Sequence, residues 1–361
     1  MTARPFTAAR NVRLLYGYMG VANLQPHLAL WVVYLLDFRG LTLTEVGIME
    51  GFFWGISLLL ELPTGAFSDR FGRCPTAIVA SVVEGAGIIA FALAGSFPAL
   101  LGAYVLWSGG LAFRSGNSDA MLYDTLTSTD RSADYARLRG RLGALDAGAL
   151  MLGGIFGAAV AAATNLQLPI LLGVISSAVS AVIAFGMQEP PRHAVHRSLS
   201  YLGTLTGAVG ALRRDAALRY IILFDIVVVS AFVADFLLMQ PFLIRHDVAL
   251  ALFGLFLIPT RLLGAGASIV AWRVPPLLGG LRPMVGLVLF GVCAGLTLLG
   301  LVDSLAAYAG FVISRSRSTS PRPRSVRTST TARPPTCARR CSPSSRSAWP
   351  PSSASPRSSA A

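Results

Sequence analysis

Long apolar segments separated by short polar or charged connections run through most of the chain. The hydrocarbon core of a membrane is about 30 Å thick, and about 20 apolar residues in a helix can cross it. Nine segments meet this requirement, and a tenth begins near Leu305 and stops being apolar after Ile313. The nine segments are residues 14–38, 46–66, 76–95, 99–124, 142–162, 168–187, 220–243, 249–272 and 284–301.

Helices are the expected form of these segments, because lipid offers no partner for unpaired backbone groups. A transmembrane barrel would need alternating strands of about ten residues, and the sequence does not contain them. We therefore predict an all-α polytopic membrane protein with nine to ten spans.

Composition supports a lipid environment, since 54% of the residues are hydrophobic and only 13% are charged. The net charge of +13 is typical of nucleic-acid binding proteins, but ten of the thirty arginines lie in residues 314–361, which contain no acid. The preceding part has twenty arginines against seventeen acids, a net charge of +3. We expect no nucleic-acid partner, because the basic tail lacks interleaved aromatic residues.

The arginines also predict the orientation in the membrane. With the N-terminus in the cytoplasm, sixteen arginines lie on the cytoplasmic side and only Arg39 and Arg245 lie outside. Arg4, Arg10 and Arg13 precede the first span without a small-residue cleavage pattern, so an uncleaved first helix is expected. We predict a multi-pass protein of the cell membrane. Sequence does not reveal the oligomeric state, and a monomer is the expectation.

Four regions follow from these patterns. Residues 1–187 form an N-terminal six-helix bundle, and residues 188–219 form a polar cytoplasmic linker that starts with Glu189-Pro190-Pro191. Residues 220–313 form a partial C-terminal bundle, and residues 314–361 form a disordered basic tail rich in Ser, Arg and Pro.

The connection after the second span, residues 61–73, is a charged turn between two apolar segments. It contains Gly65, Asp69, Arg70, Gly72 and Arg73, and it resembles the G-x-x-x-D-R-x-G-R-R loop of the major facilitator superfamily. Cys74 stands where that pattern has a second basic residue.

The resemblance implies roles for three charged side chains. Asp69 would help to hold the two halves in an outward-closed state, and Arg73 would pair with Asp124 at the cytoplasmic end of the fourth span. Ordinary turn chemistry is the alternative: Gly65 and Gly72 would relieve backbone strain, and Asp69 would cap the next helix.

The resemblance also implies a fold and a function. The fold would be that of the major facilitator superfamily, with a complete first bundle and an incomplete second one around a central cavity. The chain would be a secondary active transporter that moves a small organic solute by alternating access and is coupled to protons, with efflux by antiport as the expected direction. No enzyme motif, Walker-type loop, cofactor or metal site is evident, and the four cysteines form no metal or disulfide pattern.

The tail suggests a displaced reading frame. Residues 314–361 contain 15 serines, 10 arginines and 8 prolines in 48 positions. If the bases of the coding sequence are grouped into codons one position earlier, the serine codons become codons for apolar residues. The tail would then become a membrane span. On this hypothesis the last two spans are missing, and the alternative function is that of a frame-damaged carrier that does not transport.

Tyr16, Asn23, His27, Trp31 and Tyr34 in the first span share one face of a continuous helix, within about 80°. This stripe is predicted to face the cavity, where aromatic and hydrogen-bonding groups suit an organic solute. The alternative is helix packing with Tyr and Trp at the membrane interface.

Charges within spans need partners or a water-filled cavity. Arg114 resembles the arginine of proton-coupled exporters, although the usual R-x-x-Q-G reads Arg114-Ser115-Gly116-Asn117-Ser118 here. Asp119 lies about 140° around the helix from Arg114, so these two cannot pair. Glu84 is either a proton carrier or a neutral hydrogen-bonding group, and Arg261 could pair with Asp225 or Asp235. The full set of substrate or proton pathway candidates is Asn23, His27, Trp31, Glu84, Arg114, Asn117, Asp119, Asp225, Asp235 and Arg261. The charged residues Glu50 and Asp146 also lie within predicted spans.

The fifth span contains Gly148, Gly153, Gly154 and Gly157. It resembles the glycine-rich fifth span of exporters but lacks their usual proline. Close packing of membrane helices is the alternative explanation.

Overall fold

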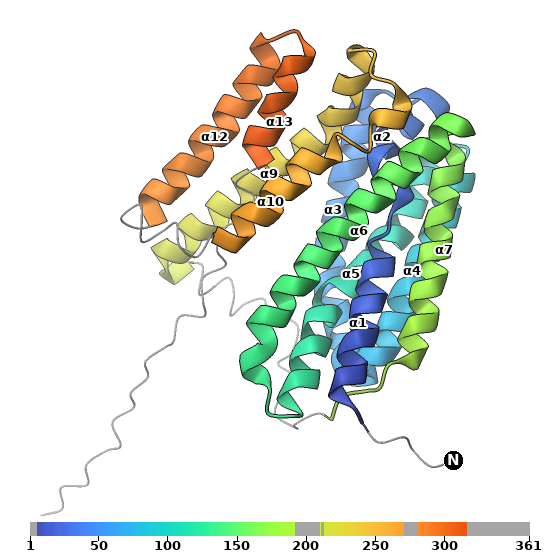
Figure 1. The fold of residues 1–361 in the computed structure, drawn as a ribbon, viewed down its shortest axis with the longest axis vertical. Helices are drawn as coiled ribbons and strands as arrows, with labels where there is room; N and C mark the ends of the chain where they lie inside the picture. The colour runs from blue at the N-terminus through green and yellow to red at the C-terminus, as the bar shows by residue number, and fades with distance from the viewer. Residues whose placement is uncertain (1–5, 192–209, 211–212, 271–280, 316–361) are drawn as a thin grey trace, which may run out of the picture. The chain divides into compact units, whose positions relative to one another are not determined.

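The structure is a computed structural model that describes residues 6–191, 210, 213–270 and 281–315. Within these residues all regular secondary structure is helical (Figure 1). Each of the nine predicted spans falls on helical structure, which confirms the prediction of an all-α protein.

The first six predicted spans correspond to the elements before residue 187. They are α1 (Ala8–Ala22), η1 (Pro26–Ala29), α2 (Trp31–Val33) and η2 (Tyr34–Phe38) for the first span, then α3 (Leu43–Phe71), α4 (Arg73–Leu93), α5 (Phe97–Thr127), α6 (Tyr135–Ala163) and α7 (Gln167–Gly186). The later elements are α9 (Ala216–Arg245), η4 (Leu250–Leu252), α10 (Leu257–Val270), α12 (Leu281–Leu301) and α13 (Tyr308–Arg315).

Several helices present large apolar side chains outward. Leu58, Val182, Phe185 and Phe290 are all about 70% exposed, as expected for side chains that face lipid. By length and apolar composition, α3, α4, α6 and α7 could each cross a membrane, and the bent first segment is a fifth candidate. The helices therefore have surfaces suited to a bilayer.

The first span is broken, which corrects the prediction of a continuous helix. Its two parts, residues 8–29 and 31–38, meet at 49°. Tyr16 and Tyr34 consequently lie on different parts of the span, on either side of the bend. The Tyr16 hydroxyl donates to Leu138 O (2.7 Å), and the Tyr34 hydroxyl donates to Ala92 O (3.3 Å).

Glycines of α6 fit against this break. A Cβ on Gly153 would lie 2.6 Å from Gln25 N, and one on Gly157 would overlap Pro26 O. On the other side, Ser176 of α7 donates to Leu24 O at 2.8 Å. Close helix packing, the alternative named above, therefore accounts for two of the glycines in the fifth span.

The charged motif after the second span is mostly helical rather than a turn, because α3 continues to Phe71. Only Gly72 leaves helical geometry, with φ of 116°, a value that favours glycine. A Cβ on Gly65 would meet no atom within 4 Å, so this glycine relieves no local crowding.

Two predicted regions lie largely or wholly outside the described residues. Residues 192–209 and 211–212 of the predicted linker belong to this part of the chain, and so do residues 316–361 of the predicted tail. The division into two bundles and the reading-frame hypothesis stay predictions.

Candidate functional site

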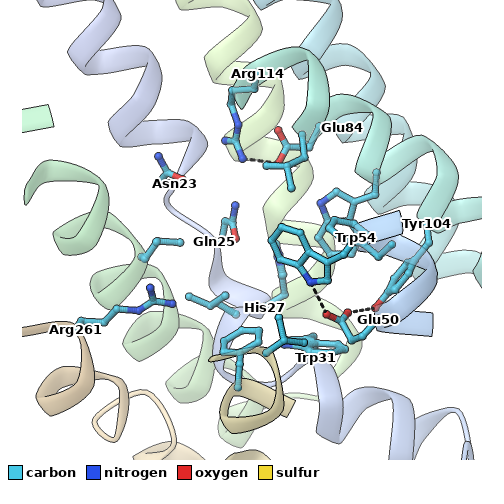
Figure 2. Close-up of a pocket in the computed structure, with 17 residues that line it drawn as sticks. Asn23, Gln25, His27, Trp31, Glu50, Trp54, Glu84, Tyr104, Arg114 and Arg261 are labelled. Carbon is cyan, nitrogen blue, oxygen red and sulfur yellow. Dashed lines mark hydrogen bonds and ion pairs between the residues drawn. The ribbon is translucent and has the colours of Figure 1, made fainter. Parts of the chain in front are cut away.

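A cavity of about 250 Å³ lies among α3, α4, α5, the broken first span and the later helices (Figure 2). Its wall is largely apolar and aromatic, with a few charged groups, as is typical of sites for organic ligands. It is lined by Asn23, Gln25, His27, Leu28, Trp31, Glu50, Phe53, Trp54, Glu84, Tyr104, Trp107, Leu111, Arg114, Leu150, Val233, Phe236 and Arg261.

One part of the wall is a buried ion pair between Glu84 of α4 and Arg114 of α5. Arg114 Nη2 lies 3.3 Å from Glu84 Oε1, and both side chains are only 6% exposed. The two helices can approach closely because Gly110 of α5 has no side chain. A Cβ there would lie 2.5 Å from the backbone nitrogen of Glu84. Glu84 thus has Arg114 as its charged partner, and its role as a proton carrier stays a prediction.

Arg114 also reaches the break in the first span. Its Nη1 donates to Ala22 O at 3.0 Å, where α1 ends. The same guanidinium therefore joins α4, α5 and α1, and satisfies a carbonyl that the end of the helix leaves without a helical partner.

Glu50 of α3 is a further charged residue in the cavity wall. Trp54 Nε1 donates to Glu50 Oε2 (3.3 Å), and the Tyr104 hydroxyl donates to Glu50 Oε1 (3.4 Å). The sequence marked Glu50 only as a charge within a span. Trp54 lies one helical turn after Glu50 on α3, so its i+4 spacing could have pointed to this contact. Tyr104 belongs to α5, and only the fold brings it to Glu50.

The three first-span candidates Asn23, His27 and Trp31 do line the cavity. Asn23 Nδ2 donates to Asp146 Oδ1 of α6 at 3.0 Å. The His27 ring lies 4.9 Å from that of Trp107, edge to face. Figure 2 shows His27 and Trp31 between Glu50 on one side and Arg261 on the other.

Arg261 of α10 is the candidate from the later helices that reaches the cavity. Its Nε is buried and has no hydrogen-bond partner among the described residues. Within the same residues it forms no ion pair with Asp235, which is itself buried. The side chain of Asp225 lies outside the described residues.

Asn117 and Asp119 do not line this cavity, in contrast to their prediction as pathway residues. Asn117 Nδ2 donates to Arg73 O (2.9 Å), and its Oδ1 accepts from Ser68 Oγ (2.7 Å). Asp119 lies 2.5 Å from Arg139 of α6. Both residues therefore contact the charged motif or a neighbouring helix instead.

The charged motif forms a network of its own at one end of α3, α4 and α5. Arg73 Nε lies 3.0 Å from Asp124 Oδ2, and Arg73 Nη1 lies 3.1 Å from Asp69 Oδ1. Arg70 lies over the ring of Phe71, 5.4 Å from its centroid. The Arg73–Asp124 contact is the one that the family resemblance implied, and its role in gating stays a prediction.

Glu189 is a residue that the sequence reasoning missed at this network. Its two carboxylate oxygens accept from the backbone amides of Arg73 (2.8 Å) and Cys74 (2.9 Å). These are the first amides of α4, which have no partner within the helix. The cap that the turn alternative assigned to Asp69 is therefore provided here by Glu189.

No group of three or more His, Cys, Asp or Glu in the described part of the chain could hold a metal ion. The chemistry available at the cavity is that of its carboxylates, guanidinium groups and aromatic rings.

The fold is similar to those of solved transporters. The nucleoside transporter NupG matches with a TM-score of 0.70 at 10% identity, over 86% of this chain and 80% of NupG. A bacterial homologue of the human lysosomal transporter Spinster, in an inward-facing and occupied conformation, matches with a TM-score of 0.60 at 17% identity, over 88% of this chain and 72% of the homologue.

No curated protein matches the sequence. The family model described as Major Facilitator Superfamily, however, matches residues 17–318, which is most of the chain. The chain is therefore a multi-pass membrane protein that belongs to the major facilitator superfamily of transporters.

Proposed function

We propose that the chain is a secondary active transporter that binds a small organic solute in the cavity and moves it by alternating access. The observation that carries this proposal is the cavity itself, whose apolar and aromatic wall includes the buried Glu84–Arg114 pair. A wall of this kind suits an organic solute better than a sugar, which needs more amide and hydroxyl partners.

Glu84 is the proton site in this proposal. Burial of an ion pair costs several kcal/mol per ion in desolvation, so the pair persists only while both partners are charged. Protonation of Glu84 would release Arg114 from the pair and leave it bound to Ala22 O at the break. A proton on α4 would thereby change the contacts of the first span, which is the coupling that a proton-driven carrier requires.

We also propose that the protein works in the cell membrane, with the N-terminus in the cytoplasm and export as its direction. The arginine distribution supports the orientation. The glycine-rich fifth span favours export by resemblance only.

Reconstitution into liposomes with an internal pH-sensitive dye tests the proposal. A panel of nucleosides, organic acids and amines is added outside, and solute-driven proton flux is measured. At least one solute should move protons in the unaltered protein. The Glu84→Gln variant should lose this flux by at least about tenfold while it retains solute exchange, because the neutral amide cannot carry a proton.

Glu61→Gln is the matched control, since Glu61 lies exposed on α3. It should leave proton flux unchanged. Normal proton flux in Glu84→Gln at equal protein content would refute the coupling role. Absence of solute-driven movement for the whole panel would count against transport by this chain.

A further inference from the structure

The hydrogen-bonding groups in the cavity wall are unevenly satisfied. Both carboxylates are occupied: Glu50 accepts from Trp54 and Tyr104, and Glu84 pairs with Arg114. The wall therefore offers a solute few acceptors that are not already in use.

The unsatisfied groups of the wall include two obligate donors. Within the described residues, Arg261 Nε and Trp31 Nε1 are buried without a hydrogen-bond partner. A guanidinium group and an indole N–H can only donate. A buried donor without a partner is costly, so these groups call for an acceptor from the solute.

Arg261 also contributes a charge that no described side chain neutralises. Arg114, the other guanidinium of the wall, has its carboxylate in Glu84, but no ion pair involves Arg261 within the described residues. Figure 2 shows Arg261 at the side of the cavity away from Glu50 and its aromatic partners. An anion placed beside Arg261 would thus avoid the Glu50 carboxylate.

The same wall also offers an apolar surface. The rings of Trp31 and Phe236 are stacked with centroids 5.8 Å apart, and both line the cavity. The cavity volume of about 250 Å³ lies below the range of about 300–1,000 Å³ usual for drug-sized ligands. It suits a solute with one small ring system.

On the basis of the proposed transport function, we infer that the solute is a small aromatic carboxylate. Its carboxylate binds Arg261, and its ring packs against Trp31 and Phe236. Arg261 is the residue that determines the charge preference, because it is the unpaired cation of the described wall.

Three probes with the same ring test this inference: indole-3-acetate, its uncharged amide and the cation tryptamine. Their binding to the purified full chain in detergent is measured by calorimetry and by the shift in thermal unfolding temperature. Indole-3-acetate should bind most tightly. Arg261→Gln should weaken its binding by about 10- to 100-fold, the size expected for one charge-assisted hydrogen bond, and should leave the amide unaffected.

Arg245→Gln is the matched control, because Arg245 is 70% exposed and pairs with Asp303 rather than with the cavity. It should bind indole-3-acetate normally. Arg261→Lys keeps the charge and should bind the anion more tightly than Arg261→Gln does, which separates loss of charge from loss of folding.

Tighter binding of tryptamine or of the amide than of indole-3-acetate would overturn the inference, and so would unchanged indole-3-acetate binding in Arg261→Gln. Neither result would contradict the proposed transport function, which the proton-flux assay tests separately with a wider panel of solutes. Failure of that assay with intact anion binding would refute transport but keep the site.

Discussion

Arg73 bonds several polar groups in and around the charged motif. It bonds Asp124, Asp69 and the Ser68 hydroxyl, while its backbone carbonyl accepts from Asn117. Asp69 is largely exposed, with 69% of its side chain accessible, so its pair with Arg73 contributes little to stability. The pair with Asp124 is better shielded and fixes α4 to α5.

We therefore expect Asp124→Asn to reduce transport at least about tenfold at normal expression, because the Arg73 guanidinium loses its shielded counter-charge. The proton-flux assay measures the effect. Asp130→Asn is the control: Asp130 is exposed, and its φ of 56° is one that Asn also tolerates. Wild-type flux in Asp124→Asn would show that this pair has no role in gating.

At this scale the sequence predicted some contacts and not others. The Arg73–Asp124 contact followed from a resemblance, since both positions belong to a motif. The Glu84–Arg114 pair could not be predicted, because the relative register of α4 and α5 is determined by their close approach at Gly110. The sequence pattern of either helix alone does not predict how α4 and α5 are aligned.

At the scale of elements, the break in the first span was the main feature that the sequence did not reveal. The spacing of its polar and aromatic residues fitted a continuous helix as well as a broken one. The break exists because other helices satisfy the backbone groups that it frees: Arg114 bonds Ala22 O, Ser176 bonds Leu24 O, and Gln240 bonds Leu28 O. The partners lie far along the chain.

The glycines of α6 test this explanation. Gly157→Ala should lower the free energy of unfolding by about 1–3 kcal/mol, the usual cost of overpacking, because the new methyl group would overlap Pro26 O. Gly148→Ala is the control, since a Cβ there meets no atom within 4 Å. Thermal unfolding of the two purified variants measures the difference. Equal unfolding temperatures would mean that the helices do not depend on this close contact.

At the scale of the whole molecule, contacts between the first and seventh predicted spans lie at one end of both segments. Gln240 Oε1 accepts from the amides of Val32 (2.9 Å) and Val33 (3.2 Å), and Gln240 Nε2 donates to Leu28 O (3.3 Å). Its side chain is fully buried. The arginine distribution predicts that this end faces outward, so Gln240 would hold the outer side of the cavity closed.

Alternating access requires these bonds to break when the cavity opens outward. Gln240→Leu removes all three while it keeps the side chain apolar and similar in size, so the outward-closed state should lose stability relative to the outward-open one. A cysteine introduced by Asn23→Cys in the cavity reports the change. A membrane-impermeant maleimide added to intact cells should label it several-fold faster in the Gln240→Leu background.

Gln167→Leu provides the matched control. Gln167 also bonds a backbone carbonyl, Ala92 O at 2.8 Å, but this bond joins α7 to α4, which both precede residue 187. Its loss should lower stability without changing the labelling rate, because the bond persists in either state of the transporter. Equal labelling rates with and without Gln240→Leu would show that Gln240 supports the broken span without controlling access. The closing of the outer side would then depend on apolar contacts, such as that of Gly154 with Leu257.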